Sequence, residues 1–171
     1  MKKYIYILSL FVISLSACKK EEAVGGTAVE ALSGEWWVQL KVGGEFDSNY
    51  GEDYYKVITY NTSENSATQM WLDVSSIWAN PAKNEMVFAK VNTNVGDLSF
   101  SADKAKNAGP YYDPTMTFNV TKGKVTKNAY VGPKSKAVSD GISLEVEFSD
   151  APGVIYQLSG YHRTKFPEDD H

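Results

Sequence analysis

The stretch Gly34-Glu35-Trp36-Trp37-Val38-Gln39-Leu40-Lys41-Val42 alternates side chains of two kinds with a period of two. Successive side chains of a β-strand point to opposite faces, so this alternation predicts a strand with one buried face. Gly43 and Gly44 end the pattern, and Ser33 separates it from the segment before it. We therefore expect the folded part of the chain to begin with this strand.

Eight further segments have the same character. Each is short, rich in β-branched and aromatic residues, and bounded by turn-forming Gly, Pro, Asn or Asp. Their expected bounds are 54–60, 68–74, 85–91, 98–101, 115–121, 124–127, 142–148 and 154–162. No segment has a helical pattern longer than one or two turns. This spacing predicts an all-β, antiparallel, up-and-down barrel of about eight to nine strands.

The N-terminus has the features of a targeting signal rather than of a folded segment. A basic start is followed by an apolar run, 4–15, which is shorter than the roughly 20 residues that span a membrane and fits a signal peptide. It ends in Leu15-Ser16-Ala17-Cys18, which resembles a bacterial lipobox. We expect a signal peptide at 1–17 and a Cys18 that carries a palmitate-containing lipid anchor.

The remaining domain bounds follow from this start. The segment 18–32 is polar and contains two adjacent glycines, which predicts a flexible tether. The barrel is expected over 33–165 and a frayed acidic tail over 166–171. Lys19-Lys20-Glu21-Glu22 resembles the surface-export signal of Bacteroidota lipoproteins. The predicted location is the cell envelope, at the outer membrane through the lipid anchor alone, with inner or outer exposure left open.

Composition excludes several classes of function. The chain has 171 residues, 17 basic and 21 acidic, and this balance lacks the basic footprint of a nucleic-acid-binding protein. Its single cysteine excludes an internal disulfide and a cysteine-based metal site. We find no spacing typical of metal ligands or of a cofactor site, and expect a monomer without a metal or cofactor.

Several short stretches resemble one known family. They are Leu158-Ser159-Gly160-Tyr161-His162-Arg163-Thr164-Lys165-Phe166-Pro167-Glu168-Asp169, Tyr60-Asn61-Thr62, Met70-Trp71-Leu72-Asp73, Gly123-Lys124-Val125 and Asp140-Gly141-Ile142. They resemble the Bacteroidota lipoproteins described as lipid-binding putative hydrolases, a lipocalin-like (calycin) group. The resemblance implies a barrel that binds a small hydrophobic or lipid-like molecule. Lipocalins also place a cation from the last strand over the first-strand Trp, which implies that Arg163 covers Trp36 and helps to close the barrel.

The inner face of the barrel has two interpretations. It is either a ligand cavity or an ordinary packed core, and both require apolar residues there. The candidate cavity residues are Val38, Leu40, Met70, Leu72, Phe100, Met116, Phe118, Leu144, Val146, Phe148, Tyr156 and Leu158. A ligand-sized apolar void would favour lipid binding, and a filled barrel with exposed loop aromatics would favour the alternative below.

Two other functions are weighed against lipid binding. Aromatic residues in or beside loops could stack on sugar rings in a surface glycan-binding or adhesion module; these are Tyr50, Tyr54, Trp78, Tyr111 and Tyr112. A Ser–His–acid hydrolase has the least support, because Ser159 and His162 fall on opposite faces of one strand and His171 is the terminal residue. No Gly-x-Ser-x-Gly elbow is present, and we expect no catalytic residue.

Overall fold

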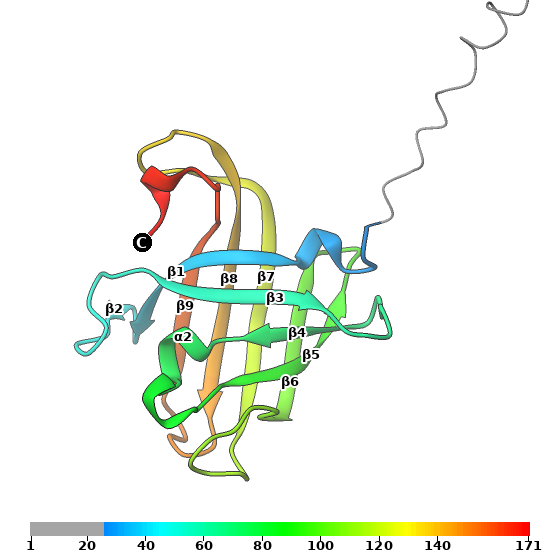
Figure 1. The fold of residues 1–171 in the computed structure, drawn as a ribbon, viewed down its shortest axis with the longest axis vertical. Coiled ribbons are helices and arrows are strands. Elements are labelled where there is room, and N and C mark those ends of the chain that lie inside the picture. Colours follow the sequence, from blue (N-terminus) through cyan, green and yellow to red (C-terminus); the bar gives the residue numbers. More distant parts are fainter. Residues whose placement is uncertain (1–25) are drawn as a thin grey trace, which may run out of the picture.

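The computed structural model describes residues 26–171. The predicted signal peptide, Cys18 and the first part of the tether lie outside these residues. Nine strands make up most of the fold (Figure 1). Their bounds are β1 Gly34–Val42, β2 Glu45–Phe46, β3 Tyr55–Asn61, β4 Gln69–Asp73, β5 Phe88–Asn94, β6 Ser99–Lys106, β7 Thr117–Val131, β8 Val138–Phe148 and β9 Tyr156–His162.

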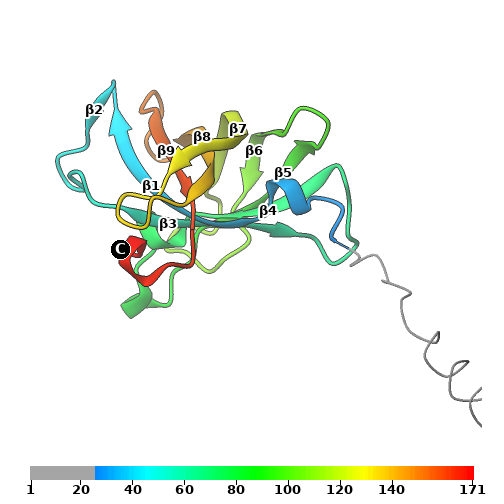
Figure 2. The same ribbon diagram turned by 90° about the horizontal axis from the view of Figure 1, so that it is seen from above.

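The strands form one closed, antiparallel, up-and-down barrel. From β3 to β9, each strand pairs with the one that follows it in the chain. Strand β1 pairs with both β3 and β9, which closes the ring of eight (Figures 1 and 2). The short β2 pairs only with the end of β1 and is additional to the ring. The predicted fold class is confirmed, and the first strand has the bounds that its alternation predicts.

The largest differences from the predicted strands lie in the second half. The two strands expected over 115–121 and 124–127 are a single 15-residue strand, β7. Its pairing with β8 shifts register between Thr121 and Lys124, a β-bulge that bends the strand without reversing it. At the same point β7 lies close to β6, since a Cβ on Gly123 would collide with the carbonyl oxygen of Phe100. The sequence pattern alone cannot distinguish this bulge from a turn.

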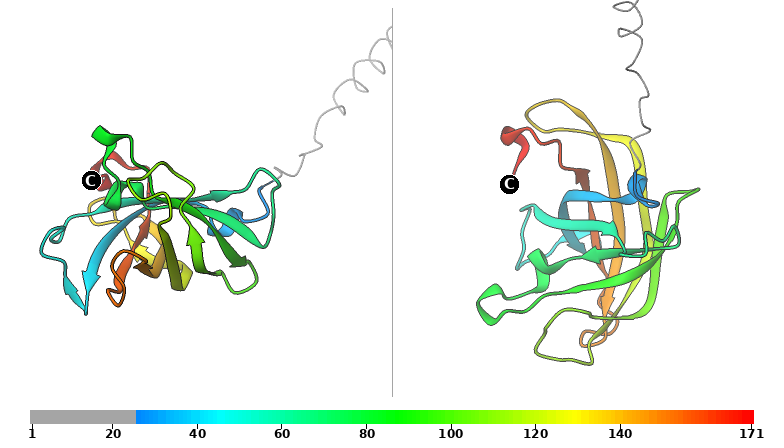
Figure 3. Two further views of the ribbon diagram at one scale, coloured as in Figure 1. Left: turned by 90° about the horizontal axis from the view of Figure 1, so that it is seen from below. Right: turned by 45° about the vertical axis from the view of Figure 1, so that its right-hand side comes forward.

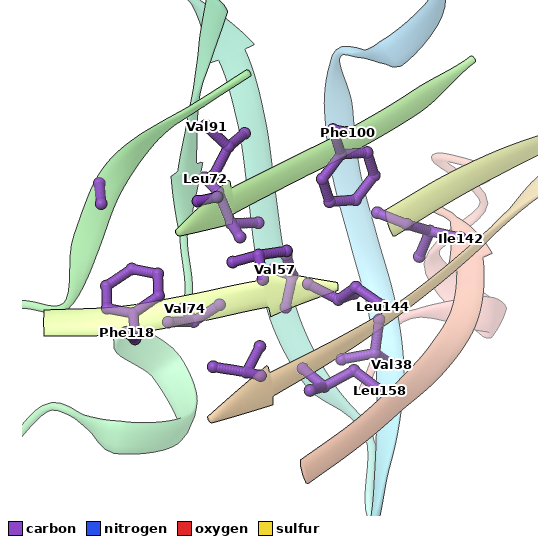
Figure 4. Packing of buried hydrophobic residues seen from close by; sticks show 14 of the residues in the cluster. Val38, Val57, Leu72, Val74, Val91, Phe100, Phe118, Ile142, Leu144 and Leu158 are labelled. Carbon is purple, nitrogen blue, oxygen red and sulfur yellow. The ribbon is translucent and has the colours of Figure 1, made fainter. Parts of the chain in front are cut away.

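Inward side chains fill the barrel with one apolar cluster (Figure 4). Figure 4 shows Val57 of β3, Leu72 of β4 and Leu144 of β8 converging on the interior from different strands. Side chains of this kind contribute roughly 1.5–3 kcal/mol each when fully buried, so this cluster provides most of the apolar stabilisation of the fold.

Short helical segments cover the two ends of the barrel (Figure 3). At the end where residue 26 lies, Val29 is completely buried, as is Leu32 of the 3-10 helix that follows it, η2 (Glu30–Leu32). The last residues of the tether predicted over 18–32 therefore belong to the fold, because their apolar side chains join the core. At the opposite end lie α2 (Ser75–Trp78), η3 (Pro81–Lys83) and the turns around 107–116 and 149–155. Within the described part of the chain, no helix is both long and apolar enough to cross a membrane.

The C-terminal residues are packed against the barrel, contrary to the prediction of a frayed tail. They form a 3-10 helix, η4 (Pro167–Asp169), beside the β7–β8 hairpin (Figure 1). The Asp169 side chain is 1% exposed, and its carboxylate accepts hydrogen bonds from the backbone N–H groups of Lys134 and Ser135, both at 2.9 Å, and from the Thr164 hydroxyl at 2.8 Å. The terminal His171 stacks on Tyr54, with ring centroids 4.1 Å apart.

We expect Asp169→Asn to release this tail. Burial acts to raise the pKa of Asp169, but hydrogen bonds from Ser135, Lys134 and Thr164 outweigh it and lower the pKa well below its usual range. The ionised carboxylate therefore stabilises the fold fully above the ordinary aspartate pKa of about 4, and this contribution is lost as pH falls toward the lower folded value. In the wild type, cleavage by carboxypeptidase should rise only in acid; in Asp169→Asn it should be fast at pH 7.

A neighbouring acid provides the control for this prediction. Glu168 is exposed, so Glu168→Gln should leave both the melting temperature and the cleavage rate unchanged. Equal cleavage of the two variants at pH 7 would show that the Asp169 hydrogen bonds do not hold the tail.

Candidate functional site

An aromatic cluster covers the end of the barrel that carries α2. We call it the aromatic mouth and define it by its residues, which come from α2, from the loops around it and from the ends of β8 and β9: Tyr50, Trp78, Tyr111, Tyr112, Phe148, Asp150 and Tyr156. Residue 26, where the described chain begins, lies at the other end (Figures 1 and 3). A tether and a ligand would therefore use opposite ends of the barrel.

Trp78 is the centre of the mouth. Its ring lies 4.7 Å from that of Phe148 and 5.3 Å from that of Tyr156, both in edge-to-face geometry, the arrangement that aromatic pairs prefer. A cavity of about 170 Å³ opens beside it and is lined by Trp78, Tyr111, Phe148, Asp150, Ala151 and Tyr156. Four of these six lining residues are aromatic.

Hydrogen bonds from tyrosine hydroxyls to backbone carbonyls hold α2 and the loop beside it over the barrel end. The Tyr50 hydroxyl donates to the carbonyl of Ile77 at 3.3 Å, and the Tyr55 hydroxyl donates to the carbonyl of Tyr50 at 3.0 Å. Ile77 is 6% exposed and belongs to the apolar core. The four-residue helix thus places Ile77 in the core and Trp78 in the mouth, because neighbouring residues of a helix point in different directions.

The mouth carries negative charge at its edge. The Tyr112 hydroxyl donates to Asp150 Oδ2 at 2.6 Å, and this hydrogen bond, with a smaller effect of burial, raises the pKa of Tyr112 to about 12. Burial raises the pKa of Tyr156, and the charges of Asp47 and Asp150 raise it further. The Tyr112 side chain remains 66% exposed, so the edge of the mouth is open to solvent.

The twelve candidate cavity residues come together in the interior. Eleven of them are buried with exposures of 0–5%, and Tyr156 is half-buried at the mouth; they are Val38, Leu40, Met70, Leu72, Phe100, Met116, Phe118, Leu144, Val146, Phe148, Tyr156 and Leu158. A side chain beside a water-sized void keeps exposed surface on that void, so the barrel interior around these residues is filled by protein, and Phe148 borders the cavity of the mouth. Their role in ligand binding stays a prediction, and a ligand deep in the barrel would have to displace them.

The loop aromatics fall into two groups. Tyr50, Trp78, Tyr111 and Tyr112 meet at the mouth, as a loop-based site requires. Tyr54 lies elsewhere, under the C-terminal tail, where its hydroxyl is 3.1 Å from that of Tyr130. Sequence reasoning missed Asp150, because no local pattern shows that the turn between β8 and β9 lies beside Trp78.

The implied contact between Arg163 and Trp36 is wrong. The ring that packs against Trp36 is that of His162, edge-on with centroids 5.0 Å apart. Trp36 and His162 are directly paired across the β1–β9 seam and point inward, so the next residue, Arg163, points outward. There Arg163 forms salt bridges with Glu35, at 2.8 Å, and with Asp170 of the tail.

A second, more polar hollow lies at the tether end. It measures about 590 Å³ and includes Glu30, Trp36, Lys127, Asp140 and His162 among its lining residues. Lys127 and Asp140 neutralise one another in a 2.8 Å salt bridge. Burial lowers the pKa of His162, which therefore favours the neutral imidazole. The charges of Lys127 and Asp140 in this hollow thus oppose one another and select no ligand class.

A catalytic triad requires a nucleophile that is hydrogen-bonded to a base. Within residues 26–171, the ring of His171 is hydrogen-bonded to the Tyr161 hydroxyl at 2.8 Å, and neither histidine ring is hydrogen-bonded to a serine or threonine hydroxyl. Ser159 is exposed on β9 while His162 points inward. The described residues also contain no group of three His, Cys, Asp or Glu side chains that could hold a metal ion.

Comparison with known proteins adds a family. The family described as "lipid-binding putative hydrolase" matches residues 21–167, which covers the barrel and the first two residues of the C-terminal tail. No curated protein matches the chain.

Proposed function

We propose that this chain, which belongs to the lipid-binding putative hydrolase family, is a lipid-anchored protein of the cell envelope that binds a small hydrophobic or lipid-like ligand at the aromatic mouth. The filled barrel interior is the outcome that favours the glycan-binding alternative. The family description, together with the barrel, supports a lipid-binding role for the chain. The anchor, the outer-membrane location and the place of binding are the further content of the proposal.

The observation that carries the proposal is the position of an aromatic-lined cavity directly over an apolar core. Phe148 belongs to both, since it lines the cavity and packs against Phe118 inside the barrel, with ring centroids 5.5 Å apart. An acyl chain that passes Phe148 into the barrel would therefore displace apolar side chains of the core. Met116, which is buried in the same core, is an adaptable side chain of the kind that repacks around ligands.

The test is native mass spectrometry of the mature protein with total lipid extract, with Trp78→Ala as the matched variant. We expect lipid adducts on the wild type and their loss from Trp78→Ala. A Tyr54→Ala variant, which changes an aromatic residue outside the mouth, should keep them. If oligosaccharides are retained and lipids are not, the glycan-binding alternative is correct and the proposed function is wrong.

The anchor has its own prediction, because lipidation at Cys18 does not depend on what the barrel binds. We expect Cys18→Ala to move the protein from the membrane fraction to the soluble fraction and to abolish incorporation of an alkyne-labelled palmitate, because two or three acyl chains anchor a protein firmly. Ser16→Ala, which keeps a small residue before Cys18, should remain membrane-bound and labelled. Membrane retention of Cys18→Ala would contradict the anchor.

A further inference from the structure

We propose that the aromatic mouth binds an organic cation, specifically a quaternary or protonated ammonium group, as the head of its ligand. This inference rests on the proposed function and narrows it to cationic or zwitterionic amphiphiles that carry an accessible ammonium group. Its basis is the combination of aromatic rings and one carboxylate around a single small cavity.

The rings meet the first requirement of such a site. Aromatic faces carry negative electrostatic potential and attract ammonium groups, and quaternary ammonium ligands are recognised by cages of several rings. Trp78, the most effective residue type for this contact, lines the cavity together with Tyr111, Phe148 and Tyr156. The cage draws these rings from α2, a loop and two strands, so it exists only in the folded barrel.

The charge around the cavity has the matching sign. Asp150 lines the cavity, and none of the other five lining residues is basic. Within residues 26–171 Asp150 forms no salt bridge, and Tyr112 uses its Oδ2 atom. Asp47 and Glu85 add negative charge near the cavity. Burial raises the pKa values of Tyr156 and Tyr111, and the charge of Asp150 raises both further, together with the charge of Asp47 at Tyr156 and of Glu85 at Tyr111. An anionic head group would be repelled here.

The size of the cavity also fits a head group rather than a whole ligand. Pockets for complete drug-sized ligands measure roughly 300–1,000 Å³, whereas this cavity measures about 170 Å³. The rest of an amphiphile would lie along the apolar residues beneath the mouth or in solvent.

Two matched ligand pairs test the charge and the chain separately. Choline and 3,3-dimethylbutan-1-ol have the same shape and differ in charge; decyltrimethylammonium and decanoate share a ten-carbon length and differ in the sign of the head. Binding to the mature protein is measured by calorimetry, with the indole NMR signal of Trp78 as the reporter of place. We expect choline to bind at least tenfold more tightly than its neutral isostere, and decyltrimethylammonium at least tenfold more tightly than decanoate.

The variants Asp150→Asn and Asp103→Asn complete the experiment. Asp150→Asn keeps the shape of the side chain and should reduce both preferences to less than threefold; Asp103, exposed on β6, is a control whose substitution should leave them unchanged. Equal binding of decyltrimethylammonium and decanoate at Trp78 overturns the cation proposal and leaves the proposed function intact. Choline binding that a decyl chain does not strengthen supports the cation site and overturns the lipid function. Binding of none of the four overturns both.

Discussion

Trp36→Ala is expected to lower the free energy of unfolding by about 3–5 kcal/mol, the range for large-to-small changes of a buried Trp or Phe. Small domains have roughly 5–15 kcal/mol of stability in total, so this one substitution should remove a large share of it. We expect the variant to be largely unfolded or aggregated at 37 °C.

The expected size of this effect follows from where Trp36 lies. Its side chain is 1% exposed, and its indole N–H donates to the Thr59 hydroxyl at 2.9 Å. Thr59 in turn donates to the carbonyl of Leu32 at 2.6 Å. Trp36 on β1 is thereby hydrogen-bonded to β3 and, through Thr59, linked to η2, while its ring packs on His162 of β9. Removal of the ring leaves a cavity, and it also leaves buried polar groups with fewer partners.

Urea unfolding followed by circular dichroism measures the effect, and two variants separate its causes. Trp36→Phe keeps most of the apolar volume and loses the hydrogen bond, so its cost should be smaller than that of Trp36→Ala. Trp71→Ala removes the same side chain from the half-buried outer face of β4, where the ring centroids of Trp71 and Phe88 lie 5.5 Å apart. If Trp71→Ala costs as much as Trp36→Ala, the special position of Trp36 is refuted.

The sequence predicted the barrel well where burial repeats with a period of two. Along β1 the fully buried residues alternate as predicted, and Ile142, Leu144, Val146 and Phe148 do so along β8. The same rule corrects the implied role of Arg163. Because Trp36 pairs with His162, any residue one step along β9 faces the outside. The family resemblance implied that Arg163 would cover Trp36, whereas the period of two identifies His162 as the inward residue.

The candidate site could be predicted only in part, since it depends on contacts between distant segments. Trp78 and Tyr111 were recognisable as loop aromatics, but their meeting with Phe148 depends on how three loops close over one barrel end. The acidic tail gave the opposite error: its composition predicts fraying, yet Asp169 finds two backbone donors in the β7–β8 hairpin. Composition cannot reveal a partner that lies 34 residues away.

Gly160→Ala is the second substitution for which we expect a very large effect, at or above the upper end of the roughly 1–3 kcal/mol that overpacking costs. Gly160 lies in β9 directly opposite Val38 of β1, at the seam that closes the barrel. A Cβ at this position would collide with the carbonyl oxygen of Trp37 and lie 2.7 Å from the Cα of Val38. Both obstacles are backbone atoms, so no side chain can rotate away to relieve the contact.

Closure of the barrel therefore depends on a glycine in the last strand, and the consequence can be measured directly. Hydrogen exchange of the β1 and β9 amides should rise in Gly160→Ala more than exchange in β4 and β5, because the seam must separate before the rest of the barrel. Gly96→Ala is the matched control: its Cβ would meet only the Asn94 side-chain oxygen, at 3.3 Å, in the turn between β5 and β6. Uniform loss of protection across all strands would show instead that the seam has no separate stability and that the barrel opens only as a whole.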